Sequence, residues 1–128
     1  MQLTIWNYMK QENIILTKTY SFALRILKIY LHLRKKKVNS DLCSQLLNSG
    51  TSVGANTEEA IGGSSRKDFI NKLQIAYREA RETSYWLRLL RDSGILEKKL
   101  AESFIADCEE IIKILTAILN TSKSGGNS

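Results

Sequence analysis

The chain contains no proline in its 128 residues, and this absence is the strongest constraint on its fold. A usual proline content near 5% would place about six in a chain of this length. Proline interrupts α-helices because it lacks a backbone donor and its ring clashes with the preceding turn. The sequence therefore favours long uninterrupted helices, and its length suffices for one hydrophobic core.

Hydrophobic periodicity and turn residues predict four helices, at roughly residues 12–37, 40–62, 66–93 and 96–120. Ser40 and Ser65 are the expected N-caps of the second and third helices, and Gly94 suits the left-handed position after the third. Connections this short favour antiparallel neighbours. We predict one all-α domain over residues 1–120, an antiparallel up-down-up-down four-helix bundle, with a disordered Ser/Gly/Asn-rich tail at 121–128.

Two of the predicted helices carry more apolar surface than one bundle core can bury. Such a core needs an apolar stripe only a little over 100° wide, whereas residues 12–37 are apolar around most of the helix circumference. On the third helix, Ile75, Trp86 and Leu89 lie off the core stripe. We expect these three residues to mediate self-association. The alternative is that Trp86 only covers the end of the bundle.

Positive charge is concentrated on the first and third predicted helices. The whole chain has a formal net charge of +6, but residues 1–37 hold +7 and residues 66–91 hold +4. The functional interpretation is binding of an RNA or DNA phosphate backbone, and the alternative is an ordinary solvated helix face. The two helices can lie side by side or diagonally. The candidate nucleic-acid-binding residues are Lys18, Arg25, Lys28, Lys35, Lys36, Lys67, Arg78, Arg81 and Arg88.

The chain lacks the residue patterns of common catalytic and cofactor sites. A di-iron bundle needs two Glu-x-x-His motifs, but His32 is the only histidine. No nucleotide-binding glycine motif occurs. We therefore expect no catalysis, metal or cofactor. Cys43 and Cys108 are far apart in the sequence and lie in no C-x-x-C arrangement, so we expect free buried thiols, with a disulfide between them as the alternative. We expect a cytoplasmic protein, because the start of the chain lacks a signal-peptide pattern and charges interrupt its most apolar stretch.

Gly50 and Gly54 lie four residues apart in the second predicted helix, which favours close helix packing. A phosphate-binding loop is the alternative, but no strand precedes it and no lysine follows at the required spacing. Asn56 and Glu59 are expected in a partly buried polar network, with Lys72 as a candidate partner of Glu59. Asp68 is also spaced to pair with Lys72.

Two ordered motifs carry a resemblance to a known family. The first is SGTSVGAN at residues 49–56, preceded by SQLL and followed by Glu59-Ala60. The second begins at Ser65-x-Lys67-Asp68-Phe69 and continues through Glu79-Ala80 to Tyr85-Trp86-Leu87. Together they resemble the four-helix bundle family encoded by intervening sequences in bacterial 23S rRNA genes. The sequence is more distantly similar to accessory proteins of diversity-generating retroelements.

The resemblance implies an antiparallel four-helix bundle that assembles as a homopentamer. For the retroelement proteins it implies a basic surface that binds nucleic acid and a partner reverse transcriptase. It supplies no catalytic residues. We therefore expect a non-catalytic scaffold that binds RNA or DNA, or alternatively a module that binds a mobile-element protein. The motif residues expected to determine fold and assembly are Gly50, Gly54, Ala55, Asn56, Glu59, Asp68, Lys72, Glu79 and Trp86.

Overall fold

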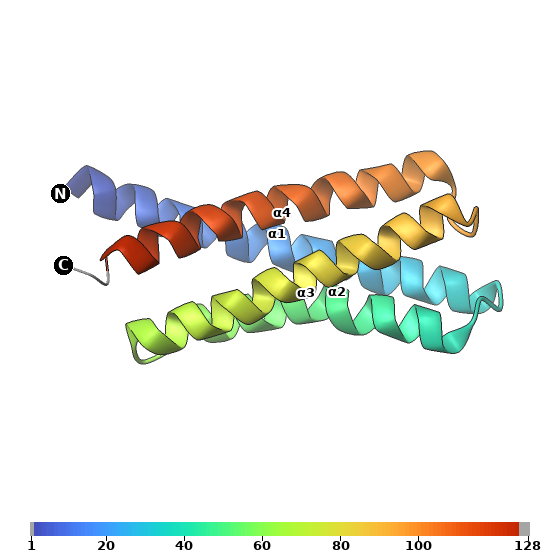
Figure 1. Ribbon diagram of the computed structural model, residues 1–128, viewed down its shortest axis with the longest axis horizontal. Coiled ribbons are helices and arrows are strands. Elements are labelled where there is room, and N and C mark those ends of the chain that lie inside the picture. The colour runs from blue at the N-terminus through green and yellow to red at the C-terminus, as the bar shows by residue number, and fades with distance from the viewer. Residues whose placement is uncertain (1, 126–128) are drawn as a thin grey trace.

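The computed structural model describes the backbone of residues 2–125 and the side chains of residues 10 and 12–124. Successive helices run in opposite directions and are joined by short turns at alternate ends (Figure 1). The predicted all-α class and the four-helix bundle are confirmed. The helices are α1 (Gln2–Lys35), α2 (Ser40–Ile61), α3 (Arg66–Asp92) and α4 (Lys98–Gly125).

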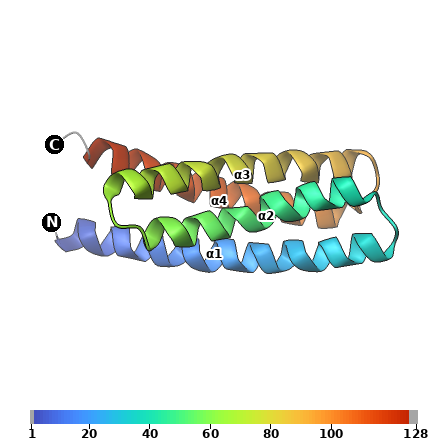
Figure 2. The ribbon, with the colours of Figure 1, turned by 90° about the horizontal axis from the view of Figure 1, so that it is seen from below.

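The helices form a ring in which each packs against two neighbours. The contacting pairs are α1 with α2, α2 with α3, α3 with α4, and α4 with α1. Helices α1 and α3 lie across the diagonal, and in the described part of the chain none of their Cα atoms approach within 8 Å of one another. Figure 2 shows α1 and α3 at opposite sides of the bundle. The two basic helices are therefore separated, a point that the sequence left open.

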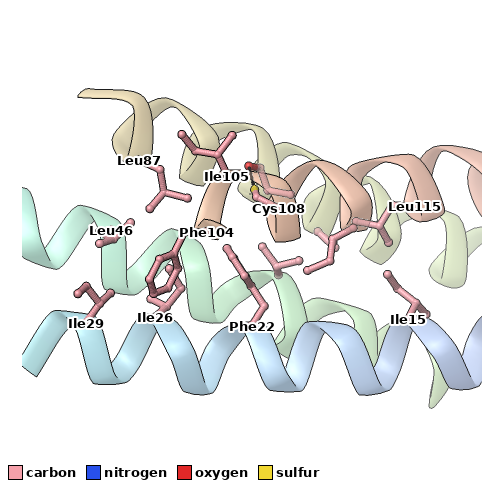
Figure 3. Packing of buried hydrophobic residues seen from close by; sticks show 14 of the residues in the cluster. Ile15, Phe22, Ile26, Ile29, Leu46, Leu87, Phe104, Ile105, Cys108 and Leu115 are labelled. Atoms are coloured by element: carbon pink, nitrogen blue, oxygen red, sulfur yellow. Dashed lines mark hydrogen bonds between the residues drawn. The ribbon is translucent and has the colours of Figure 1, made fainter. Parts of the chain in front are cut away.

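The core is built from side chains at three- and four-residue spacing on every helix, the pattern of an amphipathic helix. On α1 the fully buried members include Ile15, Phe22 and Ile26. They point toward side chains of the other helices, among them Leu46 and Leu115 (Figure 3). Burial of these apolar side chains stabilises the bundle.

Helix α2 approaches α1 closely at its two interior glycines. A Cβ added to Gly50 would lie 2.8 Å from Cγ2 of Ile26, and one added to Gly54 would lie 3.3 Å from the Thr19 carbonyl oxygen. A glycine in a helix costs about 1 kcal/mol relative to alanine. Gly54 therefore lies against the α1 backbone and Gly50 against the Ile26 side chain, and a Cβ at either position would require its neighbour on α1 to shift.

The helix boundaries agree with the sequence at some residues and differ at others. Ser65 caps α3 by accepting the Asp68 amide at 3.1 Å, as expected, and Gly94 has a φ of +78° after α3. The N-cap of α2 is Asn39 rather than Ser40, since its side chain accepts the Leu42 amide. Helix α4 begins at Lys98, two residues after the expected start near Leu96. The Glu97 carboxylate, just before the helix, accepts the Leu100 amide at 2.9 Å.

The segment expected as a disordered tail begins as a continuation of the last helix. Helix α4 continues to Gly125, and Ser122 is buried. Apolar residues of α4 pack against the bundle up to Leu119. Because tertiary packing stabilises a helix more than residue propensity does, the helix extends into the Ser- and Gly-containing segment that follows. Residues 126–128 lie outside the described residues.

Candidate nucleic-acid interface

Two of the predicted phosphate-binding cations are used to join α1 to α4. Lys18 Nζ lies 2.6 Å from Glu110 Oε1, and Arg25 Nη1 lies 2.5 Å from Asp107 Oδ2. Arg25 also donates to Ser103 Oγ, and its guanidinium stands 4.1 Å from the centre of the Phe104 ring. These contacts neutralise Lys18 and Arg25 within the molecule, so they are poorer candidates for binding phosphate than their sequence suggests.

A shallow hollow of about 260 Å³ opens along this α1–α4 seam. Its polar lining consists mainly of Lys18, Asp107 and Glu110, beside Phe22 and Ile111. The Lys18 ammonium and the two carboxylates are engaged in the ion pairs that join α1 to α4.

The remaining predicted cations are exposed and belong to no ion pair within the described residues. Two of them lie beside tyrosines. Arg81 donates to the Tyr77 hydroxyl at 3.0 Å, and the Arg88 guanidinium lies 5.8 Å from the centre of the Tyr85 ring. Because α1 and α3 are diagonal, these cations form two surfaces rather than one patch. They are Lys28, Lys35, Lys36, Lys67, Arg78, Arg81 and Arg88.

The predicted interface residues of α3 are only partly available. Ile75 and Trp86 are half-buried, and Trp86 packs against the core and donates to Glu82 at 3.2 Å. Leu89 is 41% exposed. The contact of Trp86 with the core supports the alternative in which this residue covers the bundle.

A larger exposed apolar surface lies on the outward side of α1. Its members follow four- and three-residue spacing, so they occupy one side of the helix, opposite the core. Sequence reasoning detected the excess of apolar residues on α1 but did not select these four. They are Tyr20, Leu24, Leu27 and Leu31, between 42% and 60% exposed. We call this set the α1 apolar stripe.

The polar motif residues have mostly local roles. Lys72 Nζ lies 3.6 Å from Glu59 Oε1, the pairing expected for Glu59. The expected Asp68–Lys72 pair is replaced by this one. Asn56 donates to the Ser52 carbonyl of its own helix, and Glu59 is exposed, so the expected buried network is replaced by surface and intrahelical contacts. Burial and the nearby Glu82 raise the pKa of Glu79.

Both cysteines are free and buried. Cys108 Sγ lies 3.1 Å from the Ala80 carbonyl oxygen, and burial raises the pKa of its thiol to about 12. Among the described residues no group of three His, Cys, Asp or Glu side chains is placed to hold a metal ion. None of the helices, over the same residues, has the length and apolar character needed to cross a membrane.

Both sequence motifs lie inside the range that matches a defined protein family. A family model described as 23S rRNA-intervening sequence protein matches residues 11–117. The chain belongs to this family. A solved structure of a protein of unknown function from the S23 ribosomal protein family of Bacteroides thetaiotaomicron is 42% identical, with a TM-score of 0.83. The match covers 86% of this chain and 98% of that one. No curated protein matches the chain.

The range matched by the 23S rRNA-intervening sequence family model contains every candidate residue for binding or assembly described above. The matched range contains both diagonal basic surfaces, the α1 apolar stripe and the glycine contact of α2 with α1. The family match and the similar structure identify the fold. They do not identify the function, which depends on the chemistry of these surfaces.

Proposed function

We propose that this protein is a non-catalytic, oligomeric scaffold that binds nucleic acid through exposed cations on α1 and α3. The observation that carries the proposal is the division of cations into two groups. Lys18 and Arg25 are neutralised by α4, whereas Lys28, Arg78 and Arg81 are exposed and belong to no ion pair in the described chain. Unpaired surface cations bind polyphosphate and release its counterions.

The α1 apolar stripe supports the oligomeric part of the proposal. Exposed apolar residues that follow one another along a helix mark an interaction surface more often than scattered ones do. The proposed occupant is another copy of the chain, and the resemblance noted in the sequence implies five copies. The same stripe also favours a second candidate function, binding of a partner protein such as a reverse transcriptase.

Binding to a fluorescent RNA or DNA oligonucleotide, measured by anisotropy at several salt concentrations, tests the proposed function. The variant Lys28→Gln/Arg81→Gln should weaken binding several-fold and reduce the salt dependence, because each lost phosphate contact removes counterion release. The control Lys113→Gln/Lys123→Gln removes equal charge from exposed positions on α4 and should bind nearly as wild type.

Three results would contradict the proposal. One is undetectable binding at low salt, and another is equal weakening in both variants, which would indicate a response to net charge alone. Capture of one stoichiometric protein, insensitive to nuclease, together with no oligonucleotide binding would favour the protein-partner candidate.

A further inference from the structure

The two turns at one end of the bundle bring together basic residues that are distant in sequence. The α1–α2 and α3–α4 turns lie at the same end in both views (Figures 1 and 2). Residues 34–41 and 91–99 together hold seven cations and three acids. The α2–α3 connection at the opposite end, residues 58–68, holds two cations and three acids. Positive charge is therefore specific to the first of these ends.

Two of the three acidic side chains at this end have partners within the molecule. Asp92 is paired with Arg91, and the Glu97 carboxylate caps α4. Lys35, Lys36 and Lys37 are exposed and form no ion pair in the described part of the chain. An antiparallel bundle places two helix N-termini and two C-termini at each end, so their dipoles largely cancel. The side chains determine the potential here.

Lys37 occupies a backbone conformation that is unfavourable for lysine. Its φ is +64°, in the left-handed region that favours glycine, and Lys37 N and Val38 N donate to the carbonyls of Arg34 and Leu33. This is a helix C-terminal motif in which glycine usually holds the left-handed position. At the other turn of the same end, Gly94 holds the left-handed position. A lysine at such a site opposes stability, which suggests that its charge has a use.

An exposed aromatic side chain lies near the same end. Tyr85 is 48% exposed on the last turns of α3, meets Trp86 edge-on at 5.2 Å and stands beside Arg88. An exposed ring with a neighbouring guanidinium suits stacking of an unpaired base. In a duplex the base faces are covered by their neighbours, so Tyr85 favours a single strand.

We propose that this basic end binds single-stranded nucleic acid, with Lys35, Lys36 and Lys37 on the phosphates and Tyr85 stacked on a base. The inference rests on the proposed nucleic-acid-binding function and adds, to its exposed cations along α1 and α3, a site for single strands at this end of the bundle. Lys98 and Lys99, exposed on the first turn of α4, extend the basic surface across the end of the bundle.

Lys37→Gly is the most informative variant because binding and stability should change in opposite directions. Removing the left-handed lysine should raise the thermal midpoint, whereas losing one phosphate contact should weaken binding to a labelled oligo-uridylate. Its logarithmic salt slope should fall by about 0.7. The triple variant Lys35→Gln/Lys36→Gln/Lys37→Gly should lower that slope by about 2. Lys37→Arg, which keeps the charge, should bind as wild type.

Tyr85→Ala should weaken single-strand binding about five-fold or more, whereas Tyr85→Phe, which keeps the ring, should not. Binding of the wild-type protein is also measured to duplexes of the same length and to phosphatidylserine vesicles. Binding by wild type that is lost in Lys28→Gln/Arg81→Gln but kept in the triple variant overturns this inference alone. Preference for duplex or for vesicles also overturns it, and absence of any oligonucleotide binding overturns the proposed function as well.

Discussion

At the scale of single residues, identical residue types have different roles because their neighbours differ. Lys18 and Lys28 lie on the same side of α1 in the sequence pattern, yet Lys18 is paired with Glu110 and Lys28 is exposed without an ion pair among the described residues. Glu79 and Glu59 differ in the same way. Glu59 meets Lys72, whereas burial and Glu82 raise the pKa of Glu79. The sequence alone does not distinguish the paired member of each of these two comparisons from the other.

Glu79 should make stability depend on pH in a predictable direction. A carboxyl whose pKa is raised by folding stabilises the folded state below its unfolded pKa, and this contribution is lost as pH rises through the folded pKa. Glu79→Gln should therefore increase the free energy of unfolding at pH 7, with the gain shrinking toward pH 4. Urea unfolding followed by circular dichroism, at one protein concentration, measures both values.

Glu58→Gln, at an exposed position of α2, serves as the control and should change stability little at either pH. Lower stability of Glu79→Gln at pH 7 would show that attraction by Arg78 outweighs burial and would contradict the prediction.

At the scale of elements, α1 and α4 are joined by ion pairs at the edge of an apolar core. Arg25 combines an ion pair with Asp107 and a guanidinium–ring contact with Phe104, while Lys18 has its ion pair with Glu110. The four side chains are partly exposed, so the ion pairs are screened by solvent and salt.

Arg25→Gln should therefore lower the free energy of unfolding by about 1 kcal/mol at low salt, and Lys18→Gln by less. Part of the Arg25 effect should disappear at high salt, which denaturation at two ionic strengths would reveal. Lys28→Gln on the same helix should leave stability unchanged. No loss in Arg25→Gln at low salt would show that the α1–α4 contact depends on the core alone.

At the scale of the whole molecule, the ring order of helices separates the α1 apolar stripe from the basic and aromatic surface of α3. The α1 apolar stripe lies on the outward side of α1, while Tyr85 and Arg88 lie on the diagonal helix. A bundle of this kind can associate through one face and keep another available for a ligand. The diagonal placement of α1 and α3 therefore allows one bundle both to self-associate and to bind a ligand.

Leu27→Glu should therefore reduce the molar mass in solution to that of one chain, because a buried carboxylate in an apolar interface is strongly unfavourable. Light scattering measures the mass, and circular dichroism checks that the helices remain. Leu100→Glu, at an exposed leucine outside the stripe, should assemble as wild type. A wild-type protein that is already monomeric would make the oligomeric proposal wrong.

The sequence by itself determined the helical class, the turn signals at Ser65 and Gly94, and the concentration of charge on two helices. These follow from local physics: proline is absent, glycine suits left-handed backbone, and hydrophobic spacing matches the helical period. The tertiary structure decided that the basic helices are diagonal, that Lys18 and Arg25 are neutralised, and that Lys37 lies at a basic end. Each of these depends on which helix packs beside which, and spacing along one helix contains no information about its neighbours.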